Sequence, residues 1–254
     1  MSNKRDRRKR EKNRRRPKVV AKASRSQPNP ERALMLAASA AAVDTAEPYL
    51  QGDDLADKVV ELADGTRRLA LELIEQSPLA GKHACEAGCA FCCHTAVTVS
   101  PPELFAVADY LRKHYDESEL TEVRKRLDDN AALAGSMTRD AYIAGNIPCA
   151  LLTDDGRCRV HPVRPLCCAG FLSTSRAKCD AEFRRVVGRD PVPTDNHAMA
   201  AGLGVSFGLK EACQKAGRDG EFYELNHALS RVLDTPDAAE QWARGDPVLK
   251  GCPT

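Results

Sequence analysis

Aromatic residues are scarce in this chain of 254 residues: Phe, Tyr and Trp together make up 5% of it, and there is a single Trp. Hydrophobic residues still reach 43%, so a packed core is expected to depend mainly on Ala, Leu and Val. The length is sufficient for one sizeable domain, or for one compact domain with appendages.

Sequence signals of several common protein classes are also missing. We find no internal repeat, no alternating strand–helix pattern, no phosphate-binding glycine loop and no nucleophile elbow. No export signal is visible, and the alanine-rich stretch Ala33–Val43 begins late and is too short to cross a bilayer. We therefore expect a cytoplasmic protein with no membrane partner.

The charge is distributed unevenly along the chain. Residues 1–25 contain 13 Lys or Arg and 2 acidic residues, a net charge of +11, whereas the other 229 residues contain 25 basic and 34 acidic residues, a net charge of −9. Residues 1–30 carry too little apolar surface to fold, which predicts a disordered basic arm. The cluster at residues 4–25 suits a nucleic acid or an acidic partner through counterion release, and equally a solubilising tail.

Helical patterns dominate the remaining sequence. The clearest start is at Ser100, where Pro101 and Glu103 complete the signature of a capped helix. Helices are predicted over residues 33–46, 55–79, 101–115, 118–133, 175–187, 194–216, 221–233 and 236–244. Residues 149–160 instead predict two short extended pieces joined by an Asp-Gly turn. The expected fold is mainly α, with an irregular, cysteine-rich metal-binding core that contains a short β-hairpin.

Eleven cysteines stand out against this background, and nine of them lie between residues 85 and 179. In a reducing compartment such a dense set indicates metal binding more than disulfides. The first group, CEAGCAFCC, has the spacing C-x3-C-x2-C-C and supplies Cys85, Cys89, Cys92 and Cys93. Short gaps let several thiolates face one ion, and Gly88 allows the backbone to turn tightly.

A second cysteine segment follows about sixty residues later. It reads C-x8-C-x2-H-x2-R-P-x2-C, with Cys149, Cys158, His161, Arg164 and Cys168. The predicted hairpin would bring its first two cysteines together, and His161 is a candidate ligand inside the motif. Arg164 is suited to donate charge-assisted hydrogen bonds to metal-bound thiolates.

Together the two motifs resemble the YkgJ-type cysteine-cluster family, the zinc- or iron-chelating CxxCxxCC domain, over about residues 81–180. The resemblance implies metal chelation and no general catalytic activity. It places the family's cysteines on Cys85, Cys89, Cys92, Cys93, Cys149, Cys158 and Cys168, with Cys179 as an eighth. The chain departs from the family pattern in its first gap of three residues, in His161 where Tyr is frequent, in Ala169 where Arg is common, and in the additional Cys167.

The sequence leaves the metal and the function open. Seven or eight cysteines would fill about two zinc sites, whereas one iron–sulfur cluster would use four and leave spare thiols. Cys85, Cys89 and Cys92 also have the cluster-loop spacing of radical S-adenosylmethionine enzymes, but helices follow here where those enzymes need repeated βα units. The main hypothesis is a metal-binding protein; the alternatives are an iron–sulfur redox or modifying enzyme and a nucleic-acid-associated protein.

These expectations divide the chain into four parts. They are a disordered basic arm (1–30), N-terminal helices (31–80), the cysteine-cluster metal-binding domain (81–188) and a C-terminal helical extension (189–254). His83 and His94 flank the first cysteine group and are further candidate ligands. Cys213 and Cys252 are expected to be a buried thiol and a tail thiol rather than ligands.

Overall fold

A computed structural model describes residues 29–253, so the predicted basic arm at 1–30 lies almost wholly outside the described residues. Within that part the protein is 61% helical, with ten α-helices and one pair of antiparallel strands. The predicted fold class, mainly α with a cysteine-rich irregular region and a short β element, is therefore confirmed. None of the described helices is long and apolar enough to cross a membrane.

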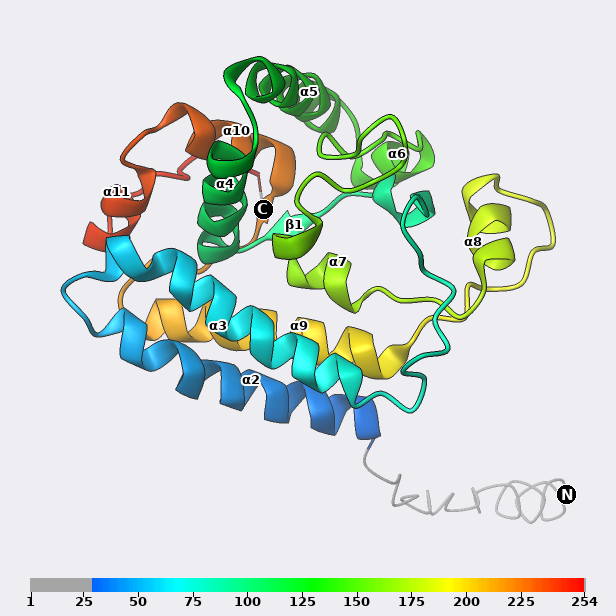
Figure 1. The fold of residues 1–254 in the computed structure, drawn as a ribbon, viewed down its shortest axis with the longest axis horizontal. Coiled ribbons are helices and arrows are strands. Elements are labelled where there is room, and N and C mark those ends of the chain that lie inside the picture. The colour runs from blue at the N-terminus through cyan, green and yellow to red at the C-terminus, as the bar shows by residue number, and fades with distance from the viewer. Residues whose placement is uncertain (1–28, 254) are drawn as a thin grey trace, which may run out of the picture.

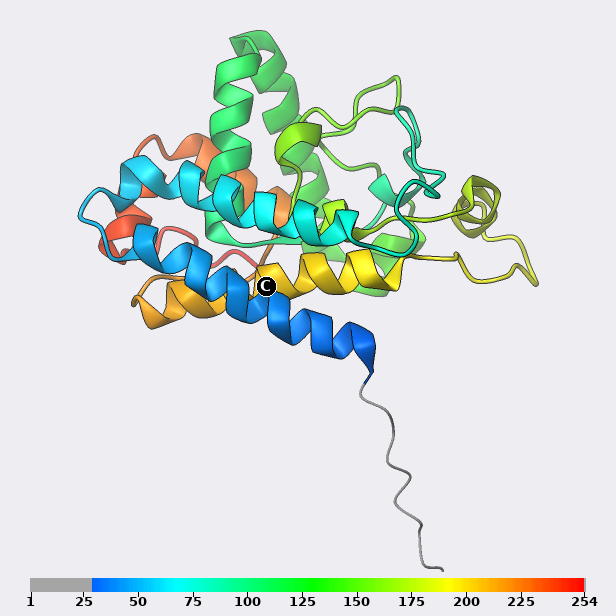
Figure 2. The same cartoon turned by 60° about the horizontal axis from the view of Figure 1, so that its bottom comes forward.

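Three long helices lie side by side along one edge of the molecule (Figures 1 and 2). They are α2 (Pro30–Leu50), α3 (Leu55–Glu75) and α9 (Asn196–Lys215). Helix α3 ends at Glu75, four residues before its predicted end, because Pro78 disfavours a helical backbone at the residue before it. Helices α2 and α3 come from residues 31–80, apart from Pro30, and α9 comes from residues 189–254. These two parts of the chain thus pack against each other in this layer.

The contact between α2 and α9 is made by small residues. Ala38 and Ala42 on α2 are fully buried, and they face Gly204 and Gly208 on α9. A Cβ atom added to Gly204 would lie 2.5 Å from the Met35 carbonyl oxygen and 2.8 Å from Ala38 Cβ. The two backbones therefore approach more closely than any larger side chain at this contact would allow.

Gly208→Ala is expected to lower the free energy of unfolding by about 1–3 kcal/mol, although alanine is the better helix former. The new methyl group would overlap the Ser39 carbonyl oxygen and lie 2.7 Å from Ala42 Cβ, so α2 must shift. Gly65→Ala in the interior of α3 is the control, since its nearest contact would be an ordinary 3.6 Å. This control should gain about 0.5–1 kcal/mol in urea unfolding. A stabilised Gly208→Ala protein would contradict the close contact.

The remaining helices cover the other side of the core (Figure 1). They are α4 (Pro101–His114), α5 (Glu117–Ser136), α6 (Arg139–Ala144), α7 (Leu166–Gly170), α8 (Arg176–Phe183), α10 (Leu225–Asp234) and α11 (Ala238–Arg244), with 3-10 turns η1 (Phe91–Cys93) and η2 (His161–Val163). Trp242 is fully buried, lies 5.6 Å from Phe105 between ring centroids, and donates its indole N–H to the Asp219 carbonyl at 2.7 Å. It is the largest fully buried side chain of this part of the core.

Two short β elements hold the irregular segments in place. Strands β1 (Thr98–Val99) and β2 (Tyr223–Glu224) pair antiparallel, with Thr98 opposite Glu224. The predicted Asp-Gly turn also forms: the Thr153 N–H donates to the Arg157 carbonyl, and Gly156 has a φ of 78°, a value that favours glycine. Only one bridge pair, Leu152 with Cys158, extends this turn into a hairpin.

Candidate metal centre

The two cysteine segments meet through their backbones. The N–H of Cys149 donates to the carbonyl of Cys93 at 2.8 Å. The glycine turns of the two segments also touch, because a Cβ on Gly156 would lie 3.1 Å from the Gly88 carbonyl oxygen. Gly88 has a φ of 83° and Gly156 one of 78°, so both turns depend on glycine for their backbone conformation as well as for this close approach. Segments far apart in the sequence are thereby placed next to each other.

Thiols from both segments lie within electrostatic reach of one another. A hydrogen bond from Cys92 lowers the pKa of the Cys93 thiol and raises that of Cys92 itself. The charges of Cys149 and Cys158 also act on the Cys93 thiol, in the direction of a higher pKa. The Cys168 thiol is affected by Cys149 and Cys93 in turn. Five predicted ligands from the two segments thus form one group of thiols.

Most of these thiols favour their neutral form in the absence of a cation. Burial raises the pKa of Cys149 to about 11 and also raises the pKa of Cys158 and Cys89. The pKa of Cys168 is raised by its hydrogen bond with Cys167, whose sulfur lies 4.0 Å away, and by burial. A bound cation reverses this preference, because the thiolate is the form that ligates metals.

The donor set fits a thiolate-bound metal by its chemistry, since several cysteines from short loops are what zinc and iron centres use. In the part of the chain that is described, however, no three His, Cys, Asp or Glu side chains are already arranged to hold an ion. The thiols lie in one region, but their sulfur atoms do not point toward a common metal position. Holding an ion would require these side chains to turn toward one point.

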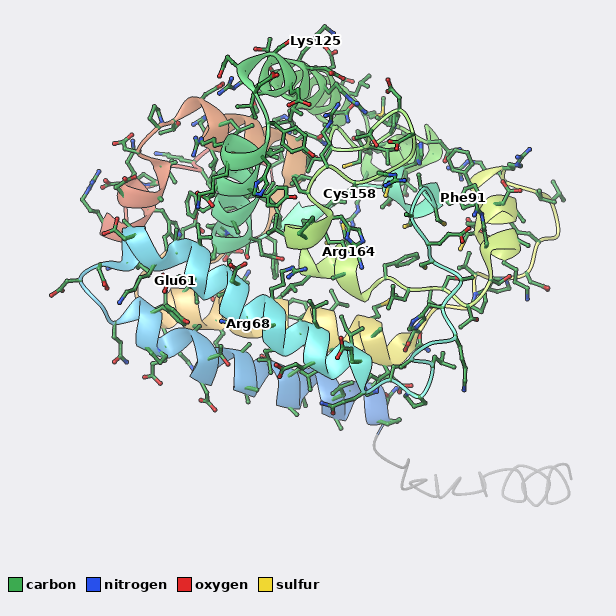
Figure 3. All side chains as sticks on the ribbon, viewed as in Figure 1. Glu61, Arg68, Phe91, Lys125, Cys158 and Arg164 are labelled. Carbon is green, nitrogen blue, oxygen red and sulfur yellow. The ribbon has the colours of Figure 1, made fainter. Side chains whose placement is uncertain are left out.

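Two other predicted ligands, Cys85 and Cys179, lie in neighbouring parts of the chain. The Cys85 sulfur accepts a hydrogen bond from the Ser173 N–H at 3.4 Å, and the charges of Cys85 and Cys92 both act on Cys89. Cys179 lies on α8, which packs against η1 through Phe183. The ring centroids of Phe183 and Phe91 lie 5.8 Å apart. Helix α8 is labelled in Figure 1, and Phe91 of η1 is labelled in Figure 3.

The histidines near the cysteines have other hydrogen-bond partners. His83 Nε2 lies 2.8 Å from Asp195 Oδ2, and His94 Nδ1 lies 2.9 Å from the Ala90 carbonyl. His161 is exposed at the start of η2, close enough to Arg164 for that charge to act on it. Arg164 also acts on the thiols of Cys92, Cys93 and Cys158. Arg164 therefore lies within electrostatic reach of three of the predicted ligands.

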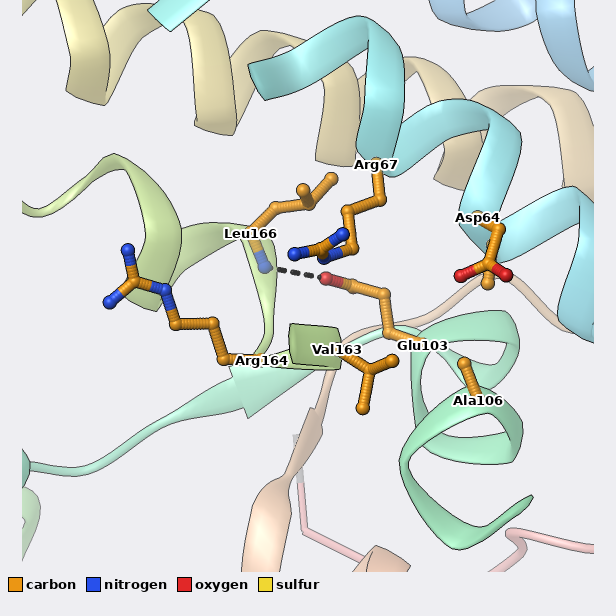
Figure 4. Close-up of a pocket in the computed structure, with 8 residues that line it drawn as sticks. Asp64, Arg67, Glu103, Ala106, Val163, Arg164 and Leu166 are labelled. Carbon is orange, nitrogen blue, oxygen red and sulfur yellow. Dashed lines mark hydrogen bonds between the residues drawn. The ribbon is translucent and has the colours of Figure 1, made fainter. Parts of the chain in front are cut away.

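A buried glutamate fixes the helix that carries Cys167 and Cys168. Glu103 Oε2 accepts hydrogen bonds from the Ser100 N–H at 3.0 Å and from its hydroxyl at 2.6 Å. Its other oxygen, Oε1, accepts a hydrogen bond of 2.8 Å from the N–H of Leu166 (Figure 4). Leu166 is the first residue of α7. One carboxylate thus joins the start of α4 to the start of α7, and the sequence signature at Ser100 predicts only the first of these two roles.

A second buried carboxylate anchors the chain just before the first cysteine. Asp195 is the N-cap of α9, where it accepts from the Ala198 N–H at 3.0 Å. It also accepts from the Ser77 hydroxyl at 2.5 Å and pairs with His83. Burial acts to raise the pKa of Asp195, but these three hydrogen bonds outweigh it and hold the pKa below its usual range.

Asp195→Asn is expected to cost about 2 kcal/mol of unfolding free energy at neutral pH, since it removes a charged cap and two further charge-assisted bonds. The folded pKa is lower than the unfolded one, so this stabilisation is complete above about pH 4 and is lost as the pH falls through the folded value. Urea unfolding of both proteins between pH 3 and pH 7 measures the difference. Asp237→Asn is the control, because that exposed N-cap of α11 makes no capping bond. A difference that stays constant down to pH 3 would contradict the role of the charge.

Comparison with known protein families agrees with this geometry. Residues 84–185 match the family model CxxCxxCC, described as "Putative zinc- or iron-chelating domain". This segment of the chain is therefore similar to the CxxCxxCC domain. The matched segment begins one residue before Cys85 and includes both cysteine segments and α8. The family resemblance seen in the sequence is confirmed, and metal binding has the support of the family. No curated protein and no solved structure matched the chain.

Proposed function

We propose that the CxxCxxCC-like segment of this chain holds a zinc or iron ion through thiolates from both cysteine segments. The proposed ligands are drawn from Cys85, Cys89, Cys92, Cys93, Cys149, Cys158, Cys168 and Cys179. The observation that carries this proposal is the meeting of the segments at the hydrogen bond from Cys149 to Cys93, with thiols of both acting on one another. A thiolate-rich centre of this kind needs nearby positive charge, and Arg164, whose charge acts on the thiols of Cys92, Cys93 and Cys158, supplies it.

The bound metal supplies either a rigid cross-link between loops or an ion that can be stored, sensed or passed on. The residues of the chain do the binding and orienting. Gly88 and Gly156 bring the loops together, Glu103 holds α7, and Asp195 holds the approach to Cys85. We also propose the cytoplasm as the location, because a reducing compartment keeps such thiols available as ligands.

The two other functions stay predictions. An iron–sulfur redox or modifying enzyme is favoured by the surplus of thiols, since Cys167 adds a sulfur next to Cys168. A nucleic acid or acidic partner of residues 4–25 involves residues outside the described part of the chain. Deleting residues 1–30 and measuring RNA affinity against salt concentration tests that partner.

Metal analysis of the full chain after anaerobic purification tests the proposed function. We expect stoichiometric zinc or iron in a protein purified without added chelator. A colourless protein with zinc identifies a zinc centre, whereas iron with visible absorption and acid-labile sulfide identifies an iron–sulfur cluster. A folded protein that contains neither metal, and takes up neither when it is added under reducing conditions, would contradict the proposal.

A further inference from the structure

A cavity of about 170 Å³ lies where α6, the strand pair β1–β2 and the segment at Pro253 meet. The same strand pair contacts the thiol group, because the carbonyl of Thr98 in β1 accepts a hydrogen bond from Cys167 Sγ at 3.4 Å. An engineered cavity of about 150 Å³ holds benzene, so this one has room for a ligand of about six non-hydrogen atoms. Its apolar wall consists of Ala96, Val97, Ala134 and Pro253. A mainly apolar wall with a few polar groups is typical of a small-molecule site.

Two side chains of opposite charge line this cavity without forming an ion pair with each other. They are Arg139 of α6 and Glu224 of β2. Glu224 accepts hydrogen bonds of 2.5–3.1 Å from the backbone and the side chain of both Asn226 and His227. None of these four donors has to carry a charge, so Glu224 keeps its negative charge in a fixed position. Arg139 is exposed, and among the described residues it has neither an ion pair nor a side-chain hydrogen bond.

Two hydroxyl groups lie on the Glu224 side of the cavity. Thr98 is directly opposite Glu224 in the antiparallel pair, and opposite residues project from the same face of a sheet. Tyr142 Oη and Glu224 Oε1 both accept from Asn226 Nδ2, at 3.4 and 2.5 Å. Burial, and to a smaller extent the charge of Glu224, raises the pKa of Tyr142, so its hydroxyl keeps its proton at neutral pH. The two hydroxyl oxygens can accept hydrogen bonds from a cationic group beside Glu224.

We propose that this cavity binds a small zwitterion of the amino-acid class, with its ammonium group at Thr98 and Tyr142 and its carboxylate at Arg139. The charge of Glu224 attracts the ammonium group. Arg139 precedes Tyr142 by three residues and therefore lies one turn away on the same face of α6. Its guanidinium group offers paired N–H donors to a carboxylate. None of these four residues is a proposed metal ligand, so this site goes beyond the metal binding proposed above.

Calorimetric titration of the full chain, as purified, at neutral pH and constant ionic strength tests this site. L-alanine and β-alanine fit the cavity and carry both charges, whereas propionate lacks their ammonium group and ethylammonium lacks their carboxylate. We expect saturable binding of at least one of the two amino acids at one site. It should be at least about tenfold tighter than the binding of either single-charge probe, which loses one charge-assisted contact. Equally tight binding of propionate or of ethylammonium, or no binding of the amino acids, would overturn the proposal.

Substitutions test which residues hold the amino acid. Arg139→Gln should weaken its binding by at least about tenfold, because a charged donor is lost, and Tyr142→Phe by about threefold, because a neutral hydrogen bond is lost. Arg68→Gln is the matched control: Arg68 of α3 is also exposed and has no ion pair or side-chain hydrogen bond among the described residues (Figure 3). This control should bind as the unchanged protein does. Equal affinities of Arg139→Gln and Arg68→Gln would overturn the site.

Two further measurements keep these outcomes separate from other failures. The melting temperature of each variant shows whether it is folded; if Tyr142→Phe is not, Thr98→Val replaces it, because valine has the shape of threonine without the hydroxyl group. Metal content is determined on the same samples. A protein that takes up no metal contradicts the proposed function, whereas the titration still tests the cavity, because no proposed metal ligand lines it.

Discussion

Glu103→Ala is expected to lower the free energy of unfolding by about 3 kcal/mol, because it leaves the Leu166 N–H and both donors of Ser100 without their acceptor. Glu103 is only 8% exposed, so water replaces these bonds poorly. The released α7 carries Cys167 and Cys168, and we therefore expect a loss of metal affinity in addition to the loss of stability. Urea unfolding and metal content of the purified variant measure the two effects.

Glu119→Ala provides a matched control for this prediction. Glu119 occupies the same position in the capping box of α5, where Oε2 accepts from the Asp116 N–H at 3.0 Å, but the hydrogen bonds of this box are exposed and join no second helix. Its removal should cost about 0.5–1 kcal/mol and leave the metal content unchanged. Equal losses of stability and of metal in the two variants would show that the link from Glu103 to Leu166 has no role in positioning α7.

Local signals in the sequence explain why the helices could be predicted. The start of α4 was predicted at its observed residue, because the Ser100–Glu103 signature and Pro101 act within one turn. Helix α7 was not predicted: it has five residues, follows Pro165, and depends on the hydrogen bond from a glutamate on another helix. The pair of strands β1 and β2 was missed for a related reason, since two-residue strands carry no recognisable alternation.

The candidate site divides in the same way. The cysteine spacings are visible within short stretches of sequence, so both cysteine segments and the turn at Gly156 could be predicted. The family match depends on the same spacings. Asp195 could not be associated with the site, because it does not lie in a motif with the cysteines. Only the fold brings it there, because this N-cap of α9 contacts Ser77 and His83 just before Cys85. The ligand set itself stays a proposal.

The central claim is that both cysteine segments hold the same metal, and Cys158→Ser tests it by the largest effect expected. Cys158 belongs to the second segment, and its thiol lies within electrostatic reach of Cys92 and Cys93 in the first. Mutation of a residue that hydrogen-bonds to a metal ligand typically lowers metal affinity by about 10–100-fold. Loss of a ligating thiolate itself should lower the affinity by more than that. Metal that is stoichiometric in the unchanged protein should then be largely lost during purification.

Metal content after parallel anaerobic purification of Cys93→Ser, Cys158→Ser and Cys252→Ser is the most direct measurement. Cys252 is the control, because it is a partly buried thiol outside the matched segment 84–185. We predict that Cys93→Ser and Cys158→Ser both lose the metal, whereas Cys252→Ser retains it with an unchanged melting temperature. Full metal content in Cys158→Ser together with loss in Cys93→Ser would contradict the account, because the first segment alone would then form the site.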